Sequence, residues 1–436
     1  MLHHIDISVS EENEKTIEEK GSEEEKNTEE KELEEEKTLS FQFPFFLLRT
    51  KRGITFMDKL AILKTTRLFG TVSLYIFPIV GAVGFALILF SASIMLASPP
   101  IREFVRSSGP FVHILIPGLN PYVPLIYGWI ALVVAMVVHE GSHGILARSF
   151  KLKVKSSGLI FLAVLPIGAF VDIDEEEIKK TAARKTGRVM AAGPMSNFVV
   201  AIISLIGLML LVGMMVPASS GVGVVGVFED SPAHNAGMLP TDTVLTLNGV
   251  TVTSGDEIQE VLLDFNPGDT ISISFLHEGD EIERNIILTD FNNTASAFIG
   301  FTGIDSSMIS DLLENYRRPQ LTSPLIYLYI PTFNLAQERV PFSETMQNFY
   351  TSPLGDYTFF TANILFWLWF VNFNLAIFNA LPLYPLDGGQ ALRSALQSYG
   401  NKRGWKENTA KKIVTASSLF IVALLISVIL GPYLFV

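Results

Sequence analysis

The chain has 436 residues, of which 49% are hydrophobic and 17% charged, and its mean hydropathy is +0.38. This composition excludes an ordinary water-soluble globular domain and indicates a membrane protein. The formal net charge of −12 does not describe the whole chain, because much of it lies in one N-terminal segment. We expect no nucleic-acid partner. The chain contains no cysteine, so a metal site would have to use histidine and carboxylate side chains.

Residues 1–38 form an acidic segment that is rich in glutamate and lysine and contains almost no aromatic residues. Such a segment buries too little apolar surface to offset its ordering entropy, so we predict that it is disordered. No positively charged leader with a small-residue cleavage site precedes it, so we expect no secretory signal peptide. A regulatory or partner-binding role is the alternative to a solvated spacer.

Five apolar stretches are long enough to cross about 30 Å of hydrocarbon, which takes roughly 20 helical residues. They cover residues 72–97, 122–146, 189–216, 357–386 and 413–436. We therefore predict a polytopic α-helical membrane protein with about five transmembrane helices. Residues 39–120 would supply a juxtamembrane segment, the first transmembrane helix and an external loop.

The second span carries the sequence His139-Glu140-Gly141-Ser142-His143 near its end. Two histidines four residues apart lie on one face of a helix, so both imidazoles can reach one metal ion. In this spacing the intervening glutamate can take a proton from the metal-bound water. Ionisable groups at membrane depth are costly and usually functional. The alternative is a hydrogen-bonded polar patch near a helix end.

Two shorter apolar stretches do not fit a simple span. Residues 156–171 are uncharged but contain Gly158, Pro166 and Gly168, so we predict β-rich or re-entrant structure packed against the helices, in the form of a small membrane-associated β segment. Backbone of that kind is tolerated at membrane depth only where protein or a water-filled cavity satisfies its polar groups. Residues 321–336 contain two prolines, and we predict that they are interfacial.

Residues 221–289 alternate short strand-like runs with turn signals such as Asn248-Gly249. The string SPAHNAG at 231–237, followed by Asp242, resembles a bacterial-type PDZ domain, although Thr241 stands where such domains usually have glycine. We place an inserted PDZ-like α+β domain at 219–290 and an extracytoplasmic or interfacial linker at 291–355. PDZ domains bind peptide ends by adding a strand to a sheet edge, so we expect peptide C-termini as ligands. A β-rich domain without a peptide ligand is the alternative.

The fourth span leads from Asn379 through Pro382 and Pro385 to Asp387 and two glycines. Prolines and paired glycines interrupt a helix and let the backbone approach a neighbour closely. With two imidazoles at the same depth, Asp387 is the natural third ligand of a catalytic zinc, which leaves the fourth position for water. Asn379 could donate a hydrogen bond to a developing oxyanion. Taken alone, Asp387 would be a capping aspartate in an ordinary turn.

The basic residues predict the orientation in the cell membrane, because cytoplasmic loops carry an excess of lysine and arginine. Such residues precede the first span and lie between spans two and three and between spans four and five. Residues 217–354, in contrast, contain no lysine and four arginines against eighteen acidic residues. We therefore predict a multi-pass protein with a cytoplasmic N-terminus, an extracytoplasmic PDZ-like domain and a metal site near the cytoplasmic side.

Three strings together resemble the site-2 protease family of intramembrane metalloproteases, over residues 120–436. They are HExxH at 139–143, GPxxN at 193–197 and NxxPxxPxDG at 379–388. The resemblance implies zinc, which we expect at one ion per chain, and cleavage of the transmembrane segments of membrane-protein substrates. It implies a protease core at 121–218, with its β segment, and a core helix ending in Asp387 within 356–436, followed by a C-terminal transmembrane helix. The acidic segment has no counterpart in this pattern.

In the predicted mechanism, zinc lowers the pKa of its bound water to about 7, and Glu140 takes the proton and passes it to the leaving nitrogen. A helical substrate must unwind before attack, and residues 156–171 could supply the strand edge that pairs with it. Three other functions compete with this one: a catalytically inactive PDZ scaffold, a membrane metal transporter, and a PDZ receptor that only binds exported peptides.

Overall fold

The computed structural model describes residues 39–109, 111, 115–120, 122–163, 165–290, 296–318, 340–355, 357–406 and 408–434. The acidic segment 1–38 and the apolar stretch 321–336 lie outside the described residues. The helices are α2 (Lys51–Ala61), α3 (Lys64–Ala97), α4 (Pro99–Ser108), α5 (Leu125–Ser149), α6 (Glu175–Lys180), α7 (Ala183–Gly213), α8 (Pro232–Asn235), α9 (Gly255–Leu262), α10 (Ser306–Arg317), α12 (Tyr357–Ala380), α13 (Asp387–Arg403) and α14 (Thr409–Leu434).

The strands belong to two main sheets and two short pairs. They are β1 (Leu39–Gln42), β2 (Phe45–Arg49), β3 (Val154–Leu162), β4 (Leu165–Ile173), β5 (Val216–Pro217), β6 (Val222–Val227), β7 (Thr243–Leu247), β8 (Val250–Thr251), β9 (Thr270–His277), β10 (Asp280–Ile287), β11 (Thr289–Asp290), β12 (Ala297–Phe298), β13 (Phe301–Ile304) and β14 (Tyr350–Thr351).

Within the described part of the chain, five helices are long and apolar enough to cross a membrane, namely α3, α5, α7, α12 and α14. They correspond to the five predicted spans. The fourth differs at its end, because α12 stops at Ala380 and Asp387 opens the separate helix α13. Pro382 and Pro385 between them lack the N–H group that continues a helix. The predicted span 357–386 is therefore too long by a short irregular loop.

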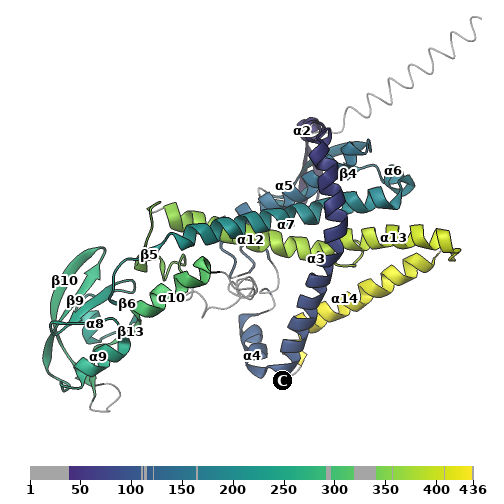
Figure 1. Ribbon diagram of the computed structural model, residues 1–436. Coiled ribbons are helices and arrows are strands. Elements are labelled where there is room, and N and C mark those ends of the chain that lie inside the picture. The colour runs from purple at the N-terminus through teal and green to yellow at the C-terminus, as the bar shows by residue number, and fades with distance from the viewer. Residues whose placement is uncertain are drawn as a thin grey trace, which may run out of the picture.

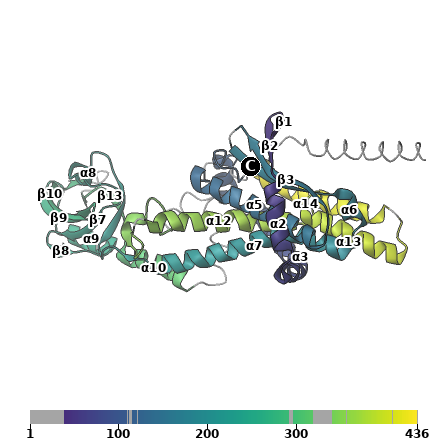
Figure 2. The same cartoon turned by 90° about the horizontal axis from the view of Figure 1, so that it is seen from above.

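Helices α7 and α12 lie side by side, and both ends of this pair carry other structure (Figures 1 and 2). At one end is the sheet of the β-rich domain, and at the other are α13 and the start of α14. Helix α5 packs against both α7 and α12. Helix α3 crosses α12 very closely, since a Cβ on Gly81 would come within 2.5 Å of the Ala380 carbonyl oxygen.

The predicted β segment is an antiparallel hairpin of β3 and β4 beside α5. It belongs to a larger sheet of order β1-β2-β3-β4, in which β2 pairs along β3 from Phe45 opposite Leu162 to Arg49 opposite Gly158. Strand β4 is therefore an edge of the sheet. It is followed by Asp174, whose carboxylate accepts from the backbone amides that begin α6. The hydrogen bond from the Glu177 amide holds the pKa of Asp174 below its usual value.

The PDZ-like domain is a sheet of order β10-β9-β7-β6-β13, with β8 paired to β7 and the short helices α8 and α9 beside it. Strand β13 pairs antiparallel with β6, so the sheet continues past residue 290, where the predicted domain ended. The buried Ile299 just before β13 belongs to the domain core. Thr241 has a φ of +93°, which explains why glycine is usual there, since β-branched residues rarely adopt positive φ.

A short connecting unit joins this domain to the membrane helices. Helix α10 continues from β13 and packs against the end of α7, where Arg317 donates to the carbonyl oxygens of Gly213 at 3.0 Å and Met215 at 2.7 Å. The Tyr350 hydroxyl donates to Ile309 in α10 at 3.0 Å, and burial raises the pKa of this hydroxyl. The carbonyls left unpaired at the end of α7 thus receive their donors from α10.

Candidate metal centre

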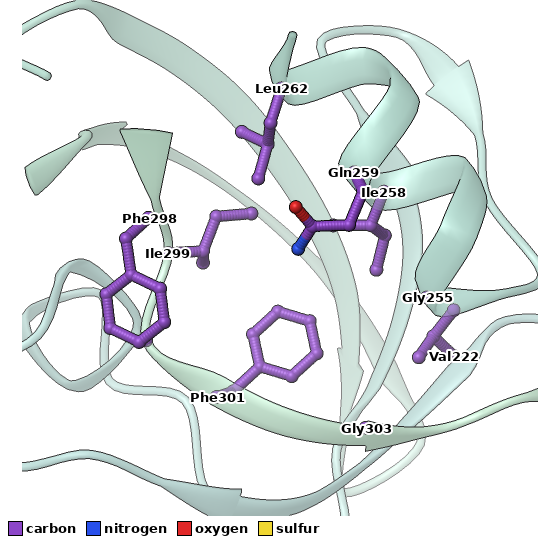
Figure 3. Close-up of a pocket in the computed structure, with 10 residues that line it drawn as sticks. Val222, Gly255, Ile258, Gln259, Leu262, Phe298, Ile299, Phe301 and Gly303 are labelled. Carbon is purple, nitrogen blue, oxygen red and sulfur yellow. The ribbon is translucent and has the colours of Figure 1, made fainter. Parts of the chain in front are cut away.

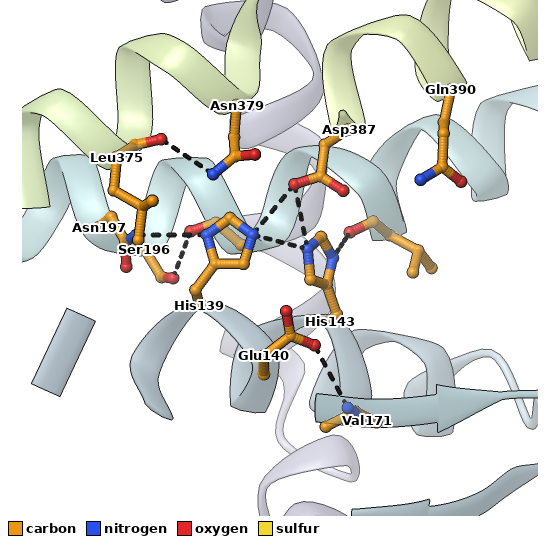
Figure 4. Close-up of polar contacts among 12 residues, drawn as sticks. His139, Glu140, His143, Val171, Ser196, Asn197, Leu375, Asn379, Asp387 and Gln390 are labelled. Carbon is orange, nitrogen blue, oxygen red and sulfur yellow. Dashed lines mark hydrogen bonds and ion pairs between the residues drawn. The ribbon is translucent and has the colours of Figure 1, made fainter. Parts of the chain in front are cut away.

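Three predicted ligands from two distant parts of the chain meet at one point (Figure 4). His139 and His143 lie one turn apart on α5, and Asp387 is the first residue of α13. Asp387 Oδ2 lies 3.0 Å from His139 Nε2 and 3.3 Å from His143 Nε2, and the two Nε2 atoms are 3.2 Å apart. All three side chains are nearly excluded from solvent. Three ligand atoms therefore converge at one largely buried point.

The spacing of these atoms fits a tetrahedral zinc ion. Ligands about 2.0–2.1 Å from a tetrahedral ion lie about 3.3–3.4 Å from one another. The observed separations of 3.0, 3.2 and 3.3 Å therefore need only a slight expansion. Two imidazoles and one carboxylate are also a donor set that catalytic zinc sites use, with one position left for water.

Helix α7 faces the ligand cluster through three residues that are spaced four positions apart. The carbonyl oxygen of Val189 accepts from His143 Nδ1 at 2.7 Å. Gly193 lies against both rings, so a Cβ there would come within 2.4 Å of His143 Nε2 and 2.8 Å of His139 Nε2. The amide of Asn197 meets His139 Nδ1 at 3.2 Å. Residues four apart share one helix face, so α7 presents a single surface to both histidines.

The partner of His139 provides an independent test of metal binding. A neutral imidazole that binds a metal through Nε2 carries its proton on Nδ1 and donates it to an acceptor. The Asn197 amide faces Nδ1 with its nitrogen, while its Oδ1 is buried and has no partner among the described residues. Turning the amide by half a rotation places Oδ1 against the Nδ1 proton. The unpartnered oxygen is thus the acceptor that ligation by His139 requires.

Glu140 points to the β sheet rather than into the ligand cluster (Figure 4). Its Oε2 accepts a hydrogen bond from the backbone N–H of Val171 at 3.2 Å. Val171 lies on β4, the edge strand beside α5. This contact fixes one carboxylate oxygen and leaves Oε1 for another proton donor. It also places the edge of β4 next to the proposed reacting centre.

Asn379 lies near the metal centre, but its amide nitrogen donates to Leu375 in its own helix at 3.1 Å. Among the described residues, it makes no hydrogen bond to His139, His143 or Asp387. Its role as an oxyanion donor therefore stays a prediction. Three contacts involve residues to which the sequence analysis gave no role. Gly193 lies against both histidines, Asn197 contacts His139, and the backbone N–H of Val171 contacts Glu140. The GPxxN string marked two of them without indicating what they do.

The paired glycines after Asp387 allow the loop to fold against the end of α12. A Cβ on Gly388 would come within 2.2 Å of the Leu381 carbonyl oxygen, and one on Gly389 within 2.4 Å of the Tyr384 amide nitrogen. Only residues without side chains permit this approach. Asp387 itself lies in the first turn of α13, where the helix dipole stabilises its negative charge.

A second candidate site is a groove in the PDZ-like domain between α9 and β13 (Figure 3). Its lining residues are apolar or glycine apart from Gln259, and they include Ile258 and Leu262 from α9, and Phe298, Ile299 and Phe301 from the other side. Strand β13 ends the sheet, so one of its edges has no strand partner among the described residues. An extended peptide can pair with such an edge.

Comparisons with known proteins identify the family to which the chain belongs. The profile described as Peptidase family M50 matches residues 127–425. The chain is 29% identical over 347 residues to an uncharacterized protein of Methanocaldococcus jannaschii, with 79% of this chain and 75% of that protein covered. It is 24% identical over 234 residues to the zinc metalloprotease RasP of Shouchella clausii, with 50% of this chain covered. The match spans 52% of RasP, about half its length.

Among solved structures, the PDZ domain of the SdrC-like protein from Listeria monocytogenes is 25% identical, with 22% of this chain and 95% of that chain covered and a TM-score of 0.19. The family match extends over more than half of the sequence and contains His139, Glu140, His143 and Asp387. The chain therefore belongs to peptidase family M50, the site-2 protease family of zinc metalloproteases.

Proposed function

We propose that the protein is a zinc-dependent intramembrane endopeptidase that cleaves transmembrane segments of membrane-protein substrates. The observation that carries the proposal is the convergence of His139, His143 and Asp387 in a buried pocket, with Glu140 beside it on the same helix. The histidines lie on α5, α7 packs against them and Asp387 follows the end of α12; α5, α7 and α12 are apolar enough to cross a membrane. A peptide bond that reaches this pocket comes from within the bilayer.

Zinc in this site would supply a bound water that is acidic near neutral pH and a positive charge beside the scissile carbonyl. Glu140 acts as the general base. Its Oε2 is held by the Val171 N–H, so Oε1 takes the proton and then delivers it to the leaving nitrogen. Asn379 stabilises the oxyanion once its amide turns from the Leu375 carbonyl, to which it donates in the resting protein.

In this proposal, the unwound segment of the substrate pairs with the edge of β4. A helical substrate keeps its carbonyls in its own hydrogen bonds, so it must become extended before attack. The outer edge of β4 runs past Val171, the residue that contacts Glu140. A substrate strand that pairs there lies next to the general base and receives replacement partners for its exposed backbone groups.

We further propose the predicted orientation, with a cytoplasmic N-terminus and the PDZ-like domain outside. The support is the absence of lysine from residues 217–354. Because the chain contains no cysteine, a single introduced cysteine reports its own position. Leu263→Cys, at a side chain that is 84% exposed, should react with a membrane-impermeant maleimide in intact cells, whereas Lys402→Cys should react only after lysis. The reverse pattern would overturn the orientation.

The groove of the PDZ-like domain is proposed to bind apolar peptide C-termini of substrates or partners. The support is its apolar lining beside the free edge of β13. A scaffold or receptor that only binds peptides would need this groove but would leave the buried ligand cluster without a role. A metal transporter would not need Glu140, which contacts Val171 rather than joining the cluster.

The test separates metal ligands from the general base. Glu140→Gln keeps the hydrogen bond from Val171 but cannot accept a proton, so it should lose peptide hydrolysis while purifying with close to wild-type zinc. His143→Ala should lose both zinc and activity, and Asp387→Asn should bind zinc more weakly because a neutral amide is a poor ligand. His234→Ala, at an exposed histidine of α8, is the matched control and should change neither.

Zinc content by mass spectrometry and cleavage of one transmembrane substrate are measured on the same preparations. Wild-type cleavage by Glu140→Gln would refute the mechanism. Zinc retention by His143→Ala would refute the metal site.

A further inference from the structure

The loop at residues 381–386 leads directly into the third metal ligand, Asp387 at the start of α13, and has little regular structure of its own. It contains two prolines and therefore four backbone N–H groups. Three of these donate within the loop or to the preceding helix, those of Leu381, Leu383 and Leu386. The fourth belongs to Tyr384, and its partner comes from another helix. Backbone groups at membrane depth need partners within the protein, so this fourth bond determines how the loop is held.

The partner of Tyr384 lies on α14, the last of the five apolar helices. The Ser418 hydroxyl accepts from the Tyr384 N–H at 2.9 Å and donates to the Val414 carbonyl at 2.8 Å, so both of its functions are used. The neighbouring Ser417 hydroxyl lies 2.9 Å from both the Pro382 and the Val414 carbonyl oxygens, so its one proton is shared between the loop and its own helix. Two consecutive serines of α14 therefore hold the two ends of one short stretch of the loop.

The same stretch of loop presses directly on the helix that begins with Asp387. A Cβ on Gly389 would come within 2.4 Å of the Tyr384 amide nitrogen and 2.5 Å of the Leu383 carbonyl carbon. The peptide between Leu383 and Tyr384 is thus enclosed by Ser418 on one side and Gly389 on the other. Asp387 is two residues before Gly389, so a shift of this peptide moves the ligand.

Serines in apolar helices commonly donate to a carbonyl one turn back in their own helix, and this alone carries no function. Ser427 on the same helix shows that ordinary behaviour, since its hydroxyl donates to Leu424 at 2.7 Å. Ser418 differs because it also accepts a hydrogen bond from the loop. Apolar packing also joins the loop to α14, because Leu381 of the loop and Ile421 of α14 belong to one buried cluster.

We propose that α14 positions the metal ligand Asp387, with Ser418 as the positioning residue and Ser417 as its support. The inference rests on the proposed metal site. It gives α14 a role in the centre although the helix contributes no ligand. Tyr384 is 48% exposed, and loss of the Ser418 hydroxyl removes the acceptor that ties its N–H to α14, so the loop keeps only the Ser417 contact with these two serines.

The experiment compares Ser418→Ala, Ser418→Thr and the matched control Ser427→Ala in the full-length protein in lipid nanodiscs. Zinc release to an excess of chelator and the absorption spectrum of the cobalt(II) form are measured, because both depend on how Asp387 is held. Partners of metal ligands typically change metal affinity 10- to 100-fold, so Ser418→Ala should release zinc about tenfold faster and alter the cobalt spectrum. Ser418→Thr keeps the hydroxyl and should restore both, and Ser427→Ala should match the wild type.

The outcomes separate this inference from the proposed function. Wild-type release and an unchanged cobalt spectrum in Ser418→Ala would overturn the positioning role while leaving the metal site intact. Equal effects of Ser418→Ala and Ser427→Ala would also overturn it, since they would reflect general loosening of α14. A wild-type protein that binds neither zinc nor cobalt would instead refute the metal site itself.

Discussion

Replacing Asn197 tests whether His139 binds a metal through Nε2. Asn197 is fully buried, and its amide meets His139 Nδ1 at 3.2 Å. Asn197→Leu conserves most of the volume but removes the acceptor, so the Nδ1 proton of a metal-bound imidazole loses its partner. An unsatisfied buried donor costs about 1–3 kcal/mol. We therefore expect zinc affinity to fall about 10- to 100-fold, which corresponds to about 1.4–2.7 kcal/mol.

Asn197→Asp is the matched variant, because a carboxylate accepts the same proton and occurs beside many metal-bound histidines. It should keep zinc affinity near the wild-type value. The assay is competition between the purified protein and a chelating dye of known affinity, alongside kcat/KM for one transmembrane substrate. Undiminished zinc affinity in Asn197→Leu would refute the tautomer argument. Equal losses in the Leu and Asp variants would show that packing, not hydrogen bonding, matters at this position.

Three further predictions follow from the same structure. Gly193→Ala places a methyl group within 2.4 Å of His143 Nε2 and should reduce zinc content measured by mass spectrometry, whereas Gly141→Ala, with nothing within 4 Å of the added Cβ, should not change zinc content. Thr241→Gly relieves a positive φ of +93° and should stabilise the PDZ-like domain by about 1 kcal/mol, seen as slower hydrogen exchange in β7; faster exchange would contradict the strain argument. If the PDZ-like domain restricts which substrates reach the metal centre, replacing residues 221–304 with a flexible linker should leave zinc in place and extend cleavage to substrates with larger ectodomains. Loss of cleavage of a minimal transmembrane peptide in this variant would disprove that restriction.

The features that sequence predicted well are those written in local patterns. The spacing of His139 and His143 places both on one helix face. The prolines and glycines around Asp387 predict an irregular loop at the end of a span. Apolar runs of membrane length located all five long helices. Each of these signals depends on residues within a few turns of one another, so no knowledge of the tertiary fold was required.

The features that sequence missed depend on contacts between distant segments. Strand β2 forms by pairing with β3, more than a hundred residues later, and its own sequence of Phe and Leu residues does not distinguish a strand from a short apolar helix. The sequence placed the end of the fourth span at residue 386, whereas α12 ends at Ala380 before the two prolines, and Gly388 packs against the Ala380 carbonyl. The role of Asn197 became visible only once its amide was found against His139.

Helix α7 has a length that separates the two candidate sites. Gly193 lies against the metal ligands, and the helix runs unbroken to Gly213, where Arg317 of α10 holds it. About 20 residues at 1.5 Å each span about 30 Å. Because α10 follows β13 and packs against this end, the PDZ-like domain with its groove lies at the opposite end of α7 from the metal ligands (Figure 1). The length of α7 therefore sets how much substrate must lie between the two sites. To cover about 30 Å, a substrate whose end is bound in the groove needs about nine extended residues or a full helical span.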